Sequence, residues 1–118
     1  RFLREIRMAR ISADELRAEL QSSPAVMVID ARTEESRALG GWIPGSIRVG
    51  DITELEIDPQ SAIVVYCDCP NDASAAVMAR KLKAMGFKHV RPLAGGIGDW
   101  RAHGFPMEQS AARAPGDT

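Results

Sequence analysis

The sequence predicts a single α/β domain, with a parallel sheet that helices cover on both faces. Residues 25–29 and 62–66 are continuous apolar runs without polar alternation, which is typical of strands buried on both sides. Helical patterns separate these runs, as the crossovers between parallel strands require. A chain of 118 residues is long enough for one domain whose hydrophobic core needs no disulfide bonds.

Short polar residues mark where the first two helices begin. Ser12 and Glu15 form a capping box, in which each side chain bonds the backbone N–H of the other residue. A helix is therefore expected to run from there to about residue 21. After the first apolar run, Thr33 predicts the start of a second helix, because its hydroxyl can accept an N–H of the first turn.

Glycines and prolines mark where elements end or turn. Gly40 and Gly41 close the second helix, and Gly86 provides a left-handed stop for the helix that follows residue 72. The shorter elements expected in the sheet and after it are a strand at 47–49 behind the Pro44-Gly45 turn, a strand at 89–91, and a helical turn after Gly95-Gly96 that carries Trp100.

The loop at residues 67–72 is the candidate functional site. It reads Cys-Asp-Cys-Pro-Asn-Asp and joins a buried strand to the start of a helix. Unpaired N–H groups converge at such a junction, and the helix dipole favours a thiolate over a thiol. Cys67 is therefore predicted to be reactive. The alternative is a small buried hydrophobe at a strand end.

Composition excludes several classes of function. A net charge of -1 gives no overall nucleic-acid footprint, and no apolar run approaches the length of a membrane span. Two cysteines two positions apart cannot join distant elements, which points to a reducing compartment or to reaction chemistry. With His89 and His103 they match no zinc spacing, so neither metal nor cofactor is expected. A cysteine-dependent phosphatase is disfavoured, because no arginine follows Cys67 before Arg80.

Three segments, in order, resemble the rhodanese-like domain family. They are Asp30-Ala31-Arg32 with Gly-Trp-Ile-Pro-Gly-Ser-Ile at 41–47, then Tyr66-Cys67 at the position of the active-site cysteine, then Leu93-Ala94-Gly95-Gly96 with Trp100. The resemblance covers about residues 11–108. It implies a five-stranded, mainly parallel sheet with helices on both faces.

The resemblance also implies sulfur transfer. Cys67 would be the nucleophile that takes sulfane sulfur from a small donor, holds it as a persulfide and passes it to a thiol or another nucleophile. Backbone amides of the loop would bind the charge. The residues implied in this cradle are Asp68, Cys69, Asn71, Asp72 and Ala73. Cys69 is also a candidate resolving thiol, which would make the site a redox centre.

The loop departs from the usual family pattern. Pro70 stands where the family often has glycine, and it removes one amide donor. Asp72 stands where a basic residue is common. Together with Asp68 it opposes an anionic donor at a cost of about 1–4 kcal/mol. Thiosulfate is therefore expected to be a poor substrate, and a weak or inactive regulatory or docking module is the alternative.

A narrower resemblance concerns the context of the domain. The string Cys-x-Cys-Pro-Asn, followed by an acidic residue, Ala and Ser, resembles rhodanese-like domains fused behind DedA-type integral membrane proteins. Residues 1–10, with four arginines, would form a basic juxtamembrane connector, and residues 109–118 a disordered tail. We therefore expect a cytoplasmic domain, at the inner face of a membrane, fused to or associated with a membrane protein.

Other conspicuous residues are expected to have structural roles. Asp30 and Arg32 could belong to an active site, but Asp30 is expected to accept backbone hydrogen bonds at the end of its strand. Trp42, which replaces a histidine common in the family, and Trp100 are expected to pack in the core or at its rim. The alanines at 75, 76 and 79 should let their helix pack closely on the sheet.

Overall fold

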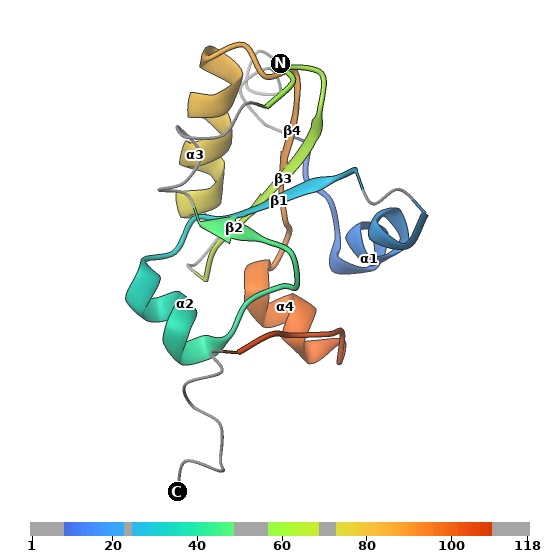
Figure 1. Cartoon of the computed structure of the whole chain (residues 1–118), viewed down its shortest axis with the longest axis vertical. Helices are drawn as coiled ribbons and strands as arrows, with labels where there is room; N and C mark the ends of the chain where they lie inside the picture. The colour runs from blue at the N-terminus through green and yellow to red at the C-terminus, as the bar shows by residue number, and fades with distance from the viewer. Residues whose placement is uncertain (1–8, 23–24, 49–56, 69–72, 110–118) are drawn as a thin grey trace, which may run out of the picture.

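A parallel sheet lies at the centre of the computed structural model, which describes residues 9–22, 25–48, 57–68 and 73–109 (Figure 1). Its four strands pair in the order β2-β1-β3-β4, and every pairing is parallel. The strands are β1 (Met27–Asp30), β2 (Ile47–Arg48), β3 (Ala62–Tyr66) and β4 (His89–Pro92). The predicted α/β class is confirmed, and β1 and β3 correspond to the two apolar runs.

The sheet differs from the prediction in its number of strands, because the described residues form four strands and not five. Next to β4, Ile11 makes only a single parallel bridge with Leu93. The Ile11 N–H donates to the carbonyl of Pro92 at 3.0 Å, and the Ile11 carbonyl accepts from Ala94 at 2.8 Å. The capping box at Ser12 begins a helix immediately afterwards, so this pairing does not extend beyond Leu93.

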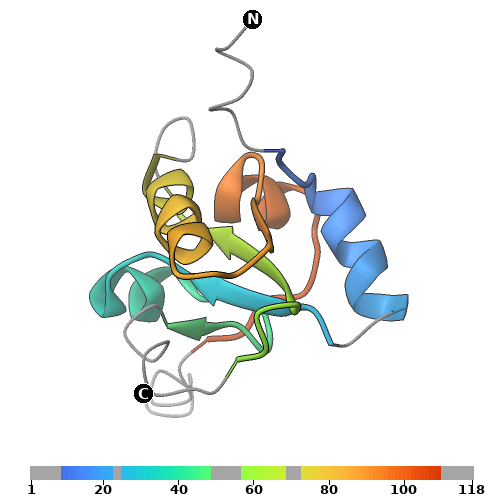
Figure 2. The same ribbon diagram turned by 90° about the horizontal axis from the view of Figure 1, so that it is seen from above.

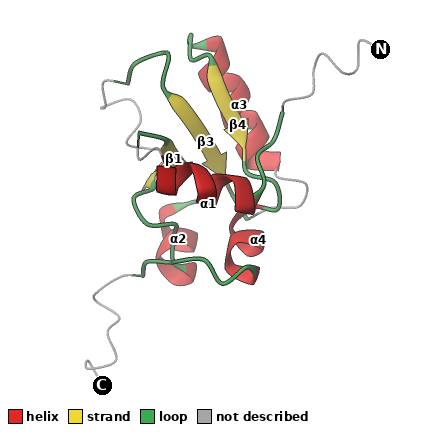
Figure 3. Ribbon diagram, turned by 90° about the vertical axis from the view of Figure 1, so that its right-hand side faces the viewer, coloured by secondary structure: helices red, strands yellow, loops and turns green. Residues whose placement is uncertain are grey.

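Helices cover both faces of the sheet (Figure 2). Helix α3 (Ala73–Ala84) packs on one face, while α1 (Ala13–Ser22) and α4 (Gly96–Ala102) pack on the other. Figure 3 shows α1 in front of the strands. Because side chains alternate along β3, Val64 and Tyr66 belong to the buried cluster of α1 and α4, and Ile63 and Val65 to the cluster of α3. Helix α2 (Glu34–Gly40) buries no residue.

The predicted helix signals are confirmed. In the capping box, Ser12 N–H donates to Glu15 Oε1 at 2.9 Å and Glu15 N–H donates to Ser12 Oγ at 3.1 Å. Thr33 Oγ1 accepts from the N–H of Ser36 at 3.1 Å. Gly86 has a φ of 109°, which lets the next N–H return to the carbonyl of Leu82 at 3.1 Å.

The alanines of α3 pack on the sheet as predicted, and three other predicted segments are only partly described. Ala75 and Ala79 are buried against the sheet, as expected, and Ala76 is half-buried. The predicted strand at 47–49 is described only to Arg48, because Val49 lies outside the described residues. Most of the basic connector (residues 1–8) and most of the tail (residues 110–118) also lie outside the described residues.

Gly41 is a glycine that the fold tolerates poorly as alanine. Its φ is 80°, and an added Cβ would lie 2.8 Å from the carbonyl oxygen of Glu108. That oxygen is fixed, because it accepts the N–H of Trp42 at 2.8 Å. Gly45 is a matched control, since its φ is 82° and its Cβ would meet nothing within 4 Å.

We expect Gly45→Ala to lower the free energy of unfolding by about 1–2 kcal/mol through backbone strain alone. Gly41→Ala should cost roughly 1–3 kcal/mol more, because the backbone at Glu108 must also move. Urea denaturation of both variants measures the difference. Equal losses would contradict the close approach at Gly41.

Candidate functional site

Cys67 directly follows β3, at the edge of the sheet where the carboxyl ends of the strands meet. Ligands of open α/β sheets bind beyond this edge. The carbonyl oxygen of Cys67 accepts the N–H of Ile97, in the first turn of α4, at 3.0 Å. The backbone on which the predicted nucleophile sits is therefore fixed by a helix from the far end of the chain.

The side chain of Cys67 is almost completely covered. Only 1% of the residue is exposed, and it belongs to the apolar cluster beneath α3 that includes Ile29, Val65, Ala75 and Ala79. The structure thus places Cys67 on its predicted strand end, but in a state in which solvent does not reach the thiol. This burial matches the alternative of a small buried hydrophobe.

The rest of the predicted cradle is described only at its two ends. Asp68 is exposed directly after Cys67, and Ala73 is exposed at the start of α3. Cys69, Asn71 and Asp72 lie outside the described residues, as does Pro70. The amide cradle and the resolving thiol therefore stay predictions. Helix α3 has 12 residues, so its amino end can favour a negative charge beside the loop.

The two histidines lie apart from Cys67. His89 begins β4, at the opposite end of the sheet from Cys67, with Nε2 3.3 Å from Gln60 Oε1. His103 follows α4, with Nε2 3.6 Å from Asp14 Oδ2. Across the described ranges, no three His, Cys, Asp or Glu side chains come together as a possible metal site.

Asp30 lies at the centre of a buried polar network that the sequence did not reveal. Its carboxylate accepts the Tyr66 hydroxyl at 2.9 Å, Arg32 Nε at 3.0 Å and Arg32 Nη2 at 2.7 Å. Asp30 is fully buried, and the side chain of Arg32 is only 4% exposed. The predicted structural role agrees with these contacts. Among the described residues, only the N–H of Arg32, at 3.0 Å, is a backbone donor to this carboxylate, so side chains dominate where backbone bonds were expected.

The same network holds the segment between α2 and β2. Arg37 Nη1 lies 3.3 Å from Asp30 Oδ2, and its Nη2 donates to the carbonyl of Ser46 at 2.9 Å. The Tyr66 oxygen accepts the N–H of Ile43 at 3.2 Å and lies 3.1 Å from Ser46 Oγ. Tyr66 was the available signal, since it is the one residue of its apolar run with a polar group to satisfy.

Both tryptophans pack as predicted. Trp100 is 1% exposed and lies in the core with Tyr66. Trp42 is half-buried at the rim, where the Arg37 guanidinium carbon lies 4.8 Å from its ring centroid. The Trp42 indole N–H donates to Glu108 Oε1 at 2.9 Å. Neither ring is near Cys67 in the cluster beneath α3.

Burial sets the protonation of this network. Burial raises the pKa of Tyr66 above its ordinary value and the charge of Asp30 adds to it, while the hydrogen bond with Ser46 opposes the shift. For Arg32, burial acts to lower the pKa, but the hydrogen bonds and charge of Asp30 outweigh it, and the pKa is raised. The phenol therefore stays protonated and the guanidinium charged.

Tyr66 is the only tyrosine, so its titration can be measured directly. A phenol with a raised folded-state pKa contributes stability that is present below the unfolded pKa of about 10 and is lost as pH rises through the folded value. Ultraviolet absorbance of tyrosinate should therefore show a higher midpoint in native protein than in urea. A native midpoint at or below the denatured one would contradict the buried network.

The chain is similar to known proteins of one family. The family model for the rhodanese-like domain matches residues 12–103. No curated protein matches the chain. Among solved structures, the rhodanese-like domain of an Anabaena sp. protein is 26% identical, with a TM-score of 0.75 over 90% of this chain and 83% of that one.

Two further structures have the same fold. A Rhodopseudomonas palustris protein, described as of unknown function and a possible tyrosine phosphatase, is 29% identical, with a TM-score of 0.71 over 86% of this chain and 85% of that one. The polysulfide-sulfur transferase homodimer of Wolinella succinogenes is 22% identical, with a TM-score of 0.72 over 90% and 82%. The family match spans most of the sequence, from the capping box to the end of α4. The chain belongs to the rhodanese-like domain family.

Proposed function

We propose that this domain is a sulfurtransferase that carries sulfane sulfur as a persulfide on Cys67 and passes it to a thiol or another nucleophile. The observation that carries the proposal is the position of Cys67 in a chain of this family, at the carboxyl end of the central strand β3 and before the start of α3. A protein with the same fold is a polysulfide-sulfur transferase, which supports the same reaction class.

The reaction needs two displacements at sulfur. The Cys67 thiolate attacks the outer sulfur of a donor persulfide, the donor S–S bond breaks, and the donor leaves as a thiolate that takes up a proton. An acceptor thiolate then attacks the outer sulfur on Cys67. The electron pair of the broken bond returns to Cys67 as thiolate, so no net oxidation occurs. Amides of residues 68–73 would bind the charge of the persulfide.

The charge beside Cys67 supports a weakly charged donor. Asp68 is exposed next to the nucleophile, and Asp72 directly precedes α3 in the sequence. An anion approaching this loop is opposed by about 1–4 kcal/mol for a charge a few ångströms away. Thiosulfate carries both of its negative charges beside the transferred sulfur, whereas glutathione persulfide carries one there, so thiosulfate should be the poorer donor.

A non-catalytic regulatory or docking module is the second candidate, and the burial of Cys67 favours it. A thiol with 1% exposure inside an apolar cluster cannot meet a donor unless its surroundings move. Structural cysteines of this kind are unreactive. A Cys67–Cys69 disulfide would indicate a redox site instead.

Intact-mass measurement and turnover separate these candidates. After exposure to glutathione persulfide, the wild-type chain should gain about 32 Da, one sulfur atom. Cys67→Ser should not gain it, and its turnover should fall roughly 100-fold or more, because the nucleophile is lost. Cys69→Ser, which keeps the loop amide, should still gain the sulfur.

Three outcomes contradict sulfur transfer by Cys67. They are full turnover in Cys67→Ser, repeated absence of the adduct with several donors, and resistance of Cys67 to mild alkylation until denaturant is added. A mass loss of about 2 Da in wild type, absent in both cysteine variants, would indicate the disulfide. Unchanged turnover of Cys69→Ser with dithiol acceptors would remove its resolving role.

We also propose that the domain works at the inner face of a membrane, fused to or associated with a membrane protein. The narrower DedA-type resemblance and the four arginines of residues 1–10 support this placement. Among the described helices, none is both long and apolar enough to cross a bilayer.

Co-sedimentation with vesicles containing phosphatidylserine tests the basic segment. Each arginine near an anionic surface contributes about 1 kcal/mol, so Arg4→Gln with Arg7→Gln should weaken binding roughly tenfold or more. The matched control is Arg80→Gln with Lys81→Gln, two exposed charges on α3. Equal loss in both double variants would argue against the connector.

A further inference from the structure

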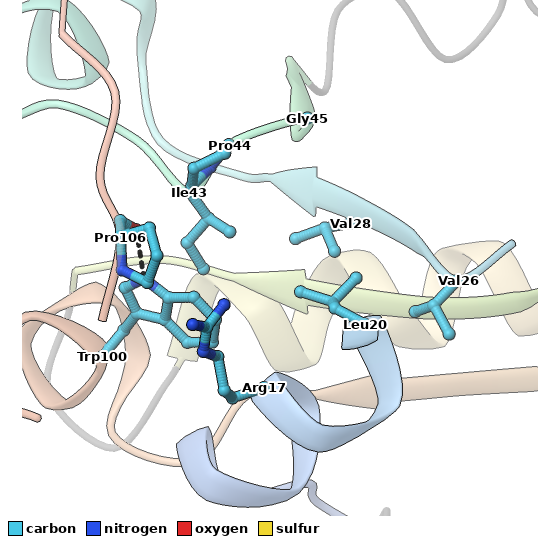
Figure 4. Close-up of a pocket in the computed structure, with 9 residues that line it drawn as sticks. All are labelled: Arg17, Leu20, Val26, Val28, Ile43, Pro44, Gly45, Trp100 and Pro106. Carbon is cyan, nitrogen blue, oxygen red and sulfur yellow. Dashed lines mark hydrogen bonds between the residues drawn. The ribbon is translucent and has the colours of Figure 1, made fainter. Parts of the chain in front are cut away.

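A cavity of about 330 Å³ opens on the face of the sheet opposite Cys67 (Figure 4). Its floor consists of the core residues Val28, Ile43 and Trp100, and its wall includes the half-buried Leu20 and Val26. These residues come from α1, β1 and the segment before it, the turn before β2, and α4. Because Cys67 belongs to the cluster beneath α3, this cavity is separate from the proposed sulfur site.

Apart from Arg17, the described side chains that line the cavity are apolar, and the Trp100 indole is already hydrogen-bonded. The indole N–H of Trp100 already donates to the carbonyl of Pro106 at 2.8 Å, so the ring offers only apolar surface. Within the described residues, no buried side-chain nitrogen or oxygen lacks a partner. A ligand here would therefore gain mainly from burial of apolar groups.

Arg17 supplies the one charge of the lining. Its side chain reaches from α1 toward Trp100 in Figure 4, and its guanidinium carbon lies 5.7 Å from the ring centroid of Phe105. Among the described residues, no carboxylate lies within ion-pair distance of it. Nearby Asp14 faces His103 and Glu19 pairs with Arg91 instead. The guanidinium is thus available to an anion that arrives with an apolar body.

We propose that this cavity binds a small amphiphile with an apolar body and a single carboxylate that pairs with Arg17. The volume is at the lower end of small-molecule pockets, and at about 30 Å³ per water-sized group it holds roughly ten non-hydrogen atoms. An eight-carbon carboxylate has this size. The site is independent of sulfur transfer, so either proposal can fail alone.

The Trp42→Phe variant keeps Trp100 as its only tryptophan, so its fluorescence can be used to measure binding in the cavity. Octanoate, octanol and octylamine are titrated against its fluorescence. Octanoate should bind saturably, about fivefold or more tighter than octanol, with octylamine weakest, because only the carboxylate pairs with the guanidinium. Arg17→Gln should reduce octanoate to the affinity of octanol. Arg80→Gln, on the other face, should change nothing.

Val26→Phe provides a second test, because it fills the cavity and should abolish binding of all three probes in a chain that still unfolds cooperatively. The proposal is overturned by equal affinity for the three probes, by octanoate binding that Arg17→Gln leaves unchanged, or by the absence of saturable binding. It is also overturned if Trp100 fluorescence changes with protein concentration alone and light scattering shows a dimer, since a second copy then occupies the cavity.

Discussion

The buried carboxylate of Asp30 ties the carboxyl ends of β1 and β3 to the segment that follows α2. Its partners are the hydroxyl of Tyr66 and the guanidinium groups of Arg32 and Arg37. Removing one member of a buried ion pair leaves an uncompensated charge, at a cost of about 3–5 kcal/mol. The arrangement is therefore held as a unit, and it fixes Tyr66 on the α1–α4 face. Cys67, the next residue, must then lie on the α3 face.

Helix α4 contacts both the backbone of Cys67 and the core on the opposite face of the sheet. Its first turn donates the N–H of Ile97 to the carbonyl of Cys67, and its second turn places Trp100 in the core on the other side. The entry to this helix requires glycine at position 95, where φ is 79° and a Cβ would lie 2.5 Å from the Cβ of Asp99. The Gly-Gly…Trp signature of the family thus has a physical role here, since it fixes the backbone of Cys67.

Features that depend on local sequence signals could be predicted, whereas contacts between distant residues could not. The capping box, the Thr33 cap and the Gly86 stop each depend on residues within about five positions, and all three are confirmed. The described residues form four of the five strands that the resemblance implied, and Ile11 adds only a single bridge to Leu93, a residue far away in the sequence. The Asp30–Tyr66 bond joins residues 36 positions apart, and four distant segments enclose the cavity. No local pattern encodes such meetings.

The burial of Cys67 places a strong condition on its chemistry. An ionised sulfur in apolar surroundings costs several kcal/mol unless N–H groups bind it. The N–H of Ile97 is already used by the Cys67 carbonyl, and in the proposed reaction amides of the loop that leads into α3 would be the stabilising donors. Pro70 cannot be one of them. The same short loop carries Asp68 and Asp72, so in the proposed reaction it would stabilise one negative sulfur while repelling other anions. Selectivity for weakly charged donors would follow from that conflict.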